Sequence, residues 1–236
     1  MEIGSTDLDP ENIPALRTLL ASCQGLVTIE ASSSTVRLVH YTLQEHLLSD
    51  PTLFHSPHSA IAEVCLTYLN FGFVWDLSPT LDSAPSTMPL LEYASLYWGW
   101  HTSRGMAQNV QLLALKLLDR FDEHVSAGLL VRHHHEYPFW IEYYRGAQEP
   151  VGFTGLHGVA FLGIVEIVAA LFEMKEWDVN AADCTGSTAL TSAAIRGHGG
   201  VVKILWERGD VNPDQADTFY GRTPLSWAAG RGHEGS

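Results

Sequence analysis

The sequence predicts a mainly α-helical protein that ends in a solenoid of short repeats. A six-residue segment that begins with glycine occurs at Gly152, Gly186 and Gly221. An alanine-rich stretch that ends in glycine follows each copy. Apolar residues at helical spacing run through residues 89–121, ahead of the first copy. Self-similarity at a fixed period of a few tens of residues indicates a repeat architecture.

Each copy has the length and composition of a pair of short helices. Thr154, Thr188 and Thr223 mark the same point in the three copies, at periods of 34 and 35 residues. A threonine hydroxyl accepts from backbone amides at a helix start, and glycine ends a helix because it adopts a left-handed conformation. Apolar second helices are expected at residues 165–172 and 201–206, each followed by Asp-Val-Asn and an exposed hairpin.

This pattern resembles the ankyrin repeat, whose motif is Gly-x-Thr-Pro-Leu-His-x-Ala-Ala…Gly-His. The resemblance covers residues 151–236, which would hold about two and a half repeats. Gly155 and Ala189 replace the proline of the motif, and Ile164 replaces the second histidine in the first copy. The second hairpin has additional residues, from Asp217 to Tyr220. These departures concern loop shape and leave the architecture unchanged.

The resemblance implies that the repeats bind a protein partner through two sets of side chains. In ankyrin repeats the contacts come from hairpin tips and from exposed positions of the first helix. The hairpin positions here are Cys184, Thr185, Phe219 and Tyr220. The first-helix positions are Phe161, Leu162, Ile195, Arg196, Trp227 and Arg231. The alternative for each residue is that it packs against a neighbouring repeat.

The segment before residue 77 is expected to contain a helix, a hairpin and two further helices. The first helix is expected at residues 14–22, and two strands at 26–29 and 36–40 form the hairpin. Thr42 and Glu45 form a capping box that predicts the next short helix. Ser59 is expected to cap a better helix. The apolar face of that helix would hold Ile61, Val64, Cys65, Tyr68 and Leu69.

Residues 77–150 are interpreted as a linker followed by a helical spacer. Ser, Thr and Pro dominate residues 77–89, which are expected to lack regular structure. A helix is predicted at residues 89–102. An apolar stripe then predicts one long helix. Its members are Met106, Val110, Leu113, Leu117 and Phe121.

The order of helix, hairpin and helices resembles the winged-helix segment that follows the NTPase module in large fungal NACHT–ankyrin receptors, which are NLR-like. The residues that carry this resemblance lie in 36–45 and 62–69. It implies three parts: a partial winged-helix segment at 1–76, a linker and spacer at 77–150, and ankyrin repeats at 151–236. It also implies a role as the protein-binding part of a signalling receptor.

The phosphate-binding loop of such receptors is absent from the sequence, because none of Lys116, Lys175 and Lys203 follows a glycine. We therefore interpret the chain as a fragment, or a short product, of a receptor whose NTPase module is missing. The alternative function is regulation in cis, in which the winged-helix part docks on the NTPase module of a full-length parent.

The charge of the chain limits its partners. It has 13 Lys and Arg against 27 Asp and Glu, for a net charge of −14. Nucleic acids and anionic membranes attract basic surfaces, so neither is expected as a partner. The distant cysteines Cys23, Cys65 and Cys184 favour a reducing compartment, and the polar N-terminus is not a signal peptide. We expect a cytoplasmic protein.

Several short motifs suggest chemistry, and each has a structural alternative. His133, His134 and His135 suggest a metal site, but adjacent side chains point in different directions, so a solvated loop is favoured. Residues 230–235 spell Gly-x-Gly-x-x-Gly but lack the strand before and the helix after that a dinucleotide site needs. Cys65 is expected in the core. We expect no enzyme, no cofactor, no metal and no small-molecule substrate.

Overall fold

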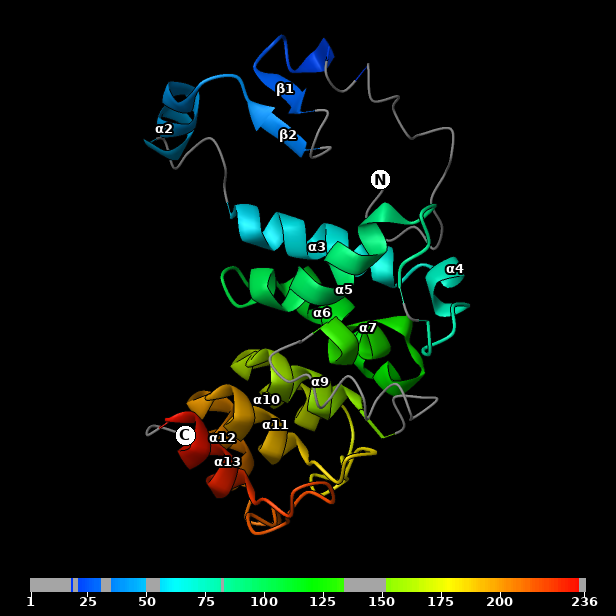
Figure 1. Ribbon diagram of the computed structural model, residues 1–236, viewed down its shortest axis with the longest axis vertical. Coiled ribbons are helices and arrows are strands. Elements are labelled where there is room, and N and C mark those ends of the chain that lie inside the picture. The colour runs from blue at the N-terminus through cyan, green and yellow to red at the C-terminus, as the bar shows by residue number, and fades with distance from the viewer. Residues whose placement is uncertain are drawn as a thin grey trace. The chain divides into compact units, whose positions relative to one another are not determined.

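The computed structural model describes residues 18, 21–30, 35–49, 56–81, 83–133 and 152–233. The chain is mainly α-helical, as the sequence predicts. Its contacts divide it into two compact units, Met1–Pro57 and His58–Ser236 (Figure 1). Each unit is described by itself.

The first unit contains a hairpin followed by a helix. Strand β1 (Val27–Glu30) pairs antiparallel with β2 (Thr35–Leu38), and Val27 lies opposite Leu38. Helix α2 spans Tyr41–Ser49. It begins one residue earlier than the expected capping box, because the His40 ring nitrogen Nδ1 accepts from the Thr42 amide at 3.2 Å. Most of the helix expected at 14–22 lies outside the described residues. The three residues of this range that are described, Thr18, Ala21 and Ser22, are helical.

None of the described side chains of the first unit is buried. Six apolar side chains in and beside the strands lie on the surface, with exposed fractions between 36% and 66%. They are Leu26, Ile29, Val36, Leu38, Val39 and Tyr41. A two-stranded hairpin with one helix has too little apolar surface to cover on its own, so these described residues form no core.

The second unit begins with two helices that lie before residue 77, and the sequence analysis predicted only the first of them. Helix α3 spans Pro57–Leu69 and α4 spans Gly72–Trp75. Because α3 starts at proline, Ser59 lies inside it and does not cap it. Cys65, Tyr68 and Leu69 are buried as expected, but Ile61 and Val64 are exposed. Ala62 and Leu66 take their places in the core.

The spacer forms three helices and a short turn of 3₁₀ helix. Helix α5 spans Pro89–Thr102, as predicted, and is followed by α6 (Gln108–Leu118), η2 (Phe121–Glu123) and α7 (Val125–His133). The single long helix expected after residue 106 is therefore divided. Its apolar stripe is nevertheless correct in part, because Val110, Leu117 and Phe121 are fully buried. His134 and His135 lie outside the described residues.

The boundary between the units falls at Pro57, whereas the sequence analysis placed a boundary at residue 76. The reason is that the end of α3 is bonded to the spacer. The His124 ring nitrogen Nε2 donates to the Leu69 carbonyl oxygen at 3.0 Å, and the Asn70 side-chain amide donates to the Leu113 carbonyl oxygen at 3.1 Å. Helix α3 thus belongs to the same core as α5, α6 and α7.

The repeats form two layers of helices (Figure 1). The first helices are α9 (Gly155–Leu162), α11 (Ala189–Arg196) and α13 (Pro224–Arg231), and α11 packs against both others. The second helices α10 (Val165–Met174) and α12 (Gly199–Trp206) pack against each other. We refer to these as the first-helix layer and the second-helix layer.

The signals that end and begin the repeat helices act as the sequence predicts, with one exception. The Thr188 and Thr223 hydroxyls accept from the Thr191 and Ser226 amides. The Thr154 hydroxyl instead lies 2.9 Å from the His157 ring nitrogen Nδ1. The glycines that end α9, α11 and α13 all have left-handed φ angles, between +71° and +74°.

Each repeat is joined to the one before it through a histidine. The ring nitrogen Nε2 of His198 donates to the Phe161 carbonyl oxygen at 3.0 Å, and that of His233 donates to the Ile195 carbonyl oxygen at 3.2 Å. The rings lie so close to Gly163 and Gly197 that a Cβ there would meet them at 2.5–2.6 Å. Glycine and histidine in consecutive copies therefore form one contact, which explains why both recur.

The first repeat departs from the motif because it packs against the spacer. A Cβ at Gly155 would overlap the Leu118 carbonyl oxygen, and one at Gly158 would meet the Phe121 ring at 2.7 Å. Leu162 approaches Gly99 of α5, where a Cβ would meet it at 2.9 Å. Ile164, at the histidine position, is fully buried. Helices α5 and α6 with η2 thus cover the first repeat.

Candidate functional site

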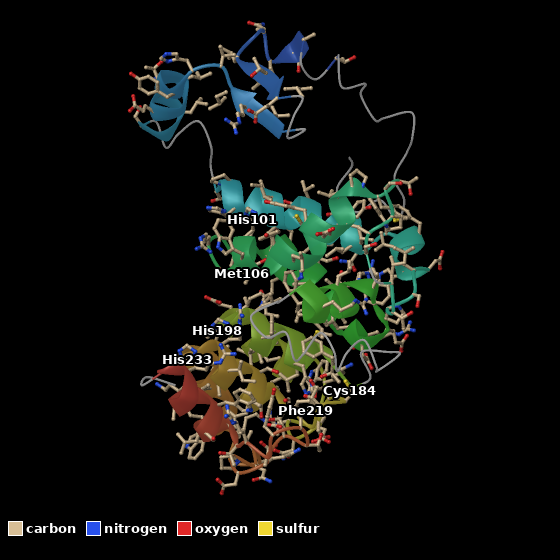
Figure 2. The ribbon with its side chains drawn as sticks, in the orientation of Figure 1. His101, Met106, Cys184, His198, Phe219 and His233 are labelled. Carbon is tan, nitrogen blue, oxygen red and sulfur yellow. The ribbon has the colours of Figure 1, made fainter. Side chains whose placement is uncertain are left out.

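The surface of the first-helix layer collects most of the side chains that the sequence analysis selected. Phe161, Leu162, Ile195, Arg196 and Arg231 are all half-buried there, and Cys184 is half-buried in a hairpin. Figure 2 shows the hairpin residues Cys184 and Phe219 on one side of the repeats and His198 and His233 on the opposite side. The Arg196 guanidinium lies 4.8 Å from the centre of the Phe161 ring. Leu162 packs on α5, so it contributes mainly to the core between spacer and repeats.

Thr185 is a correction to the expected site. Its side chain is only 1% exposed, and its hydroxyl donates to the Asp183 carboxylate oxygen Oδ1 at 2.5 Å. Its carbonyl oxygen accepts from the Thr218 amide at 2.9 Å in the next hairpin. Thr185 therefore connects two hairpins and lies inside the repeats, where no partner reaches its side chain.

Trp227 is the second correction. Its indole ring is 3% exposed, and its nitrogen Nε1 donates to the Asp217 carboxylate oxygen Oδ2 at 2.8 Å. Tyr220 packs edge-on against it, with ring centres 5.5 Å apart. Sequence reasoning missed both facts because the burial of Trp227 depends on the folding of the hairpin over it.

Phe219 and Tyr220 lie on the surface of the third repeat, each 40% exposed. Their backbone is fixed by Asp217, whose carboxylate oxygen Oδ1 accepts from both of their amides. Their rings meet edge to face with centres 4.8 Å apart. The pair is therefore partly packed and partly exposed on a well-anchored hairpin.

Arg222 belongs to the same surface, and the sequence analysis did not select it. Its guanidinium lies 4.7 Å from the centre of the Trp227 ring and 5.5 Å from that of Tyr220. A terminal nitrogen of this side chain would lie 4.0 Å from a Cβ at Gly230 in α13. Arg222 thus connects the hairpin aromatics with the first helix. Its place directly before the capping Thr223 is the signal that could have identified it.

The repeats contain a buried histidine whose role is structural. His157 is 1% exposed, and its ring nitrogen Nε2 donates to the Ser187 carbonyl oxygen at 3.1 Å in the next repeat. Burial lowers the pKa of this imidazole, and the nearby Asp183 carboxylate opposes the shift only in part. With both nitrogens engaged, His157 holds adjacent repeats together.

Within the described residues, no group of three His, Cys, Asp or Glu side chains could hold a metal ion. The rings of His58 and His101 meet with their Nδ1 atoms 3.0 Å apart, and the Tyr93 hydroxyl bonds the other nitrogen of His101. Cys65 is buried as expected, and burial raises the pKa of its thiol to about 11. A thiol with that pKa is a weak nucleophile at neutral pH. No helix in the described ranges has both the length and the apolar composition to cross a membrane.

Comparison with known families identifies the repeats. A model described as ankyrin repeats in three copies matches residues 143–235. This part of the chain consists of ankyrin repeats. The solved structures that match include a chain from the crystal structure of the yeast ribosomal protein Rps3 in complex with its chaperone Yar1, at 30% identity and a TM-score of 0.32. The match covers 34% of this chain and 59% of that one. No curated protein sequence matches.

Ankyrin repeats are protein-interaction modules. Such modules present a surface of stacked repeats to their partners, like the layers described above. We use the name first-helix surface for Phe161, Ile195, Arg196 and Arg231 together with the hairpin residues Phe219, Tyr220 and Arg222.

Proposed function

We propose that the chain binds a protein partner through the first-helix surface. The observation that carries this proposal is the aromatic pair of the third repeat: Phe219 and Tyr220 stay 40% exposed although Asp217 fixes their backbone. A large side chain that is held rigidly at the surface loses little entropy when a partner covers it. Tyrosine and arginine are the residue types that dominate binding energy at protein interfaces, and both occur here.

The arrangement of the pair determines how it is tested. Tyr220 packs on Trp227, so replacing Tyr220 removes packing within the chain as well as surface. Phe219 contacts Tyr220 at its edge and contributes less to the packing of α13. Phe219→Ser is therefore the informative single change. The double change of Phe219→Ser with Tyr220→Ser should show the larger loss of binding.

The test selects ligands for the full chain from a phage-displayed library of random peptides about 12 residues long. Phe219→Ser is expected to weaken the selected peptides about tenfold and to leave the melting temperature unchanged. Trp206→Ser is the matched control, because it removes an exposed aromatic (61%) from the second-helix layer. A lower melting temperature at unchanged affinity would show that Phe219 is structural.

We further propose that the chain is part of a cytoplasmic fungal receptor of the NACHT–ankyrin type that acts in signalling, with residues 1–76 as a partial winged helix. The hairpin and α2 of the first unit support this proposal, since they follow in the expected order. An in-frame phosphate-binding loop upstream in the genome is the expected finding, and a different upstream domain would contradict it. We also expect no enzymatic activity. ATP turnover by the purified chain above a denatured control would refute that.

The exposed strands of the first unit favour one alternative, in which this unit regulates an NTPase module in cis. Val36 in β2 and the flanking Leu26 and Val39 are all more than half exposed, and exposed apolar surface of this kind is typically covered by another domain. The full-length parent should then lose control of its nucleotide turnover when Val36 is changed to Asp. Unchanged turnover would argue against this alternative.

A further inference from the structure

We propose that the partner segment bound by the first-helix surface is acidic, with carboxylates that pair with Arg196, Arg222 and Arg231. This inference rests on the proposed function and adds the chemistry of the partner. It follows from the distribution of charge over the repeats.

The first-helix layer carries positive charge only. Helices α9, α11 and α13 contain no Asp or Glu, and their charged residues are Arg196 and Arg231. Arg222 lies in the loop that leads into α13, and its guanidinium extends toward Gly230. A partner that contacts this layer therefore meets arginines and no carboxylate from these helices.

The exposed negative charge of the repeats lies partly on helix α10 and mostly in the segments that follow the second helices, where Lys175 and Arg208 also lie. Every carboxylate in residues 152–233 lies on a second helix or in the segment that follows one. Those that are exposed are Glu166, Glu173, Glu176, Asp178, Glu207, Asp210 and Asp214. In a chain whose net charge is −14, three described helices without a carboxylate are a marked departure from the average. The first-helix layer thus carries charge of the opposite sign to that of the chain as a whole.

The two carboxylates nearest the hairpin tips do not change this distribution, because the fold uses them. Asp183 is buried and accepts from the amides of Thr185 and Ser187. Asp217 is buried and accepts from the indole of Trp227 and from backbone amides of its hairpin. Both are buried and engaged in holding the hairpins in shape, so neither adds an exposed carboxylate beside the arginines.

Two of the arginines are oriented by aromatic rings. Arg196 lies over Phe161 and Arg222 lies over Trp227, with guanidinium-to-ring distances of 4.8 and 4.7 Å. A guanidinium positioned by a ring keeps its planar fork of donors in a defined direction, which suits bidentate binding of a carboxylate. The exposed Tyr220 and Phe219 beside Arg222 add apolar contacts to the same segment.

The same charges argue for a protein segment and against a nucleic acid. A nucleic-acid binder neutralises many phosphates, and the long-range field of a chain with charge −14 repels such a polyanion. A short segment with a few carboxylates and apolar side chains needs only the local arginines. We therefore assign the surface to an acidic peptide segment.

The test measures binding of the full chain to three fluorescein-labelled pools of peptides, each about 12 residues long, that share Leu and Tyr but carry Glu, Gln or Lys at the other positions. At about 50 mM salt the Glu pool should bind about tenfold more tightly than the Gln pool, and the advantage should shrink at about 500 mM salt. The double change Arg196→Gln with Arg231→Gln should remove the advantage of the Glu pool while binding of the Gln pool persists, and the melting temperature of the variant shows whether it stays folded.

Lys203→Gln is the matched control, since it removes a positive charge from an exposed position of the second-helix layer and should keep the advantage. Equal binding of the Glu and Gln pools, or preference for the Lys pool, would overturn the inference. If both pools bind equally and Phe219→Ser abolishes their binding, the proposed function stands and only the acidic character of the partner is wrong. Absence of binding by every pool, or tighter binding of labelled single-stranded DNA, would also overturn it.

Discussion

The two ends of the ankyrin stack differ, although their sequences repeat. The same leucine of the motif is 1% exposed in the first repeat (Leu156), 3% in the second (Leu190) and 72% in the third (Leu225). The first repeat packs against α5, α6 and η2 on its other side, and α11 and α13 cover Leu156 and Leu190 in turn. The comparison teaches that neighbours decide whether a repeat residue contributes to stability, since the motif around it is unchanged.

The largest expected effect separates the middle of the stack from its exposed end. Leu190→Ala should lower the free energy of unfolding by about 3 kcal/mol, because it leaves a cavity between α11 and its neighbours. Leu225→Ala removes the same atoms from the surface and should change it by less than about 0.5 kcal/mol. Chemical denaturation of both variants measures the difference. Equal losses would show that Leu225 is covered in solution.

The next effect depends on pH and belongs to the spacer that covers the first repeat. His124 is fully buried, and burial lowers the pKa of its imidazole to about 4. Below the ordinary pKa of about 6.5 the unfolded chain takes up a proton that the folded chain does not. Stability should therefore fall as the pH drops from about 6.5 to about 4, by about 3 kcal/mol from this residue.

His124→Asn tests this assignment. Across that pH range, unfolding of the variant should take up about one proton fewer than unfolding of the unmodified chain. Its free energy of unfolding should therefore fall less steeply with decreasing pH. Above about pH 7 the unmodified chain should show no dependence from this histidine, since it is neutral in both states. An unchanged slope in the variant would assign the acid sensitivity to other groups, of which the buried His157 is the first to examine.

A glycine at the covered end provides a third test. Gly155→Ala places a Cβ where the Leu118 carbonyl oxygen lies, so the backbone of α6 or α9 must move. We expect a loss of about 2 kcal/mol in the free energy of unfolding, the usual size for overpacking. Ala189, at the same position of the second repeat, shows that the motif itself accepts alanine. No loss would mean that the spacer and the first repeat adjust freely to each other.

The smallest effect is expected at the exposed end and has the opposite sign. Gly230→Ala in α13 meets no atom closer than 4.0 Å, and alanine favours the helix more than glycine does. The free energy of unfolding should rise by up to about 1 kcal/mol. Thermal unfolding of this variant and of Gly155→Ala compares the third and the first repeat through the same glycine-to-alanine change. A destabilised Gly230→Ala variant would place a close neighbour at this position.

The repeats and α5 could be predicted from the sequence because their signals are local. Threonine at a helix start, glycine at a helix end and Pro89 at the start of α5 act within a few residues. The break between α6 and η2 was not predictable, since neither proline nor glycine marks residues 119 and 120. Tertiary contacts decide it, because Phe121 must turn to meet Gly158.

The candidate site could be predicted only in outline. The motif locates the first-helix positions, and five of the six lie half-buried at the surface. Thr185 and Trp227 were assigned wrongly because their burial depends on carboxylates of the hairpins, Asp183 and Asp217. Arg222 was missed because its role comes from an aromatic stack that forms only when the hairpin folds over α13. Such contacts have no signature in a single repeat.

The contact of Gly155 with Leu118 also gives the protein a direction of growth. A copy of residues 186–220 inserted between the second and third repeats would bring its own glycine and histidine, and would satisfy both of its neighbours. The same copy placed ahead of Gly152 would present Ala189 to the Leu118 carbonyl oxygen and His198 to the buried position of Ile164. Duplication can therefore lengthen this array on one side of the first repeat only, and the spacer remains its fixed origin.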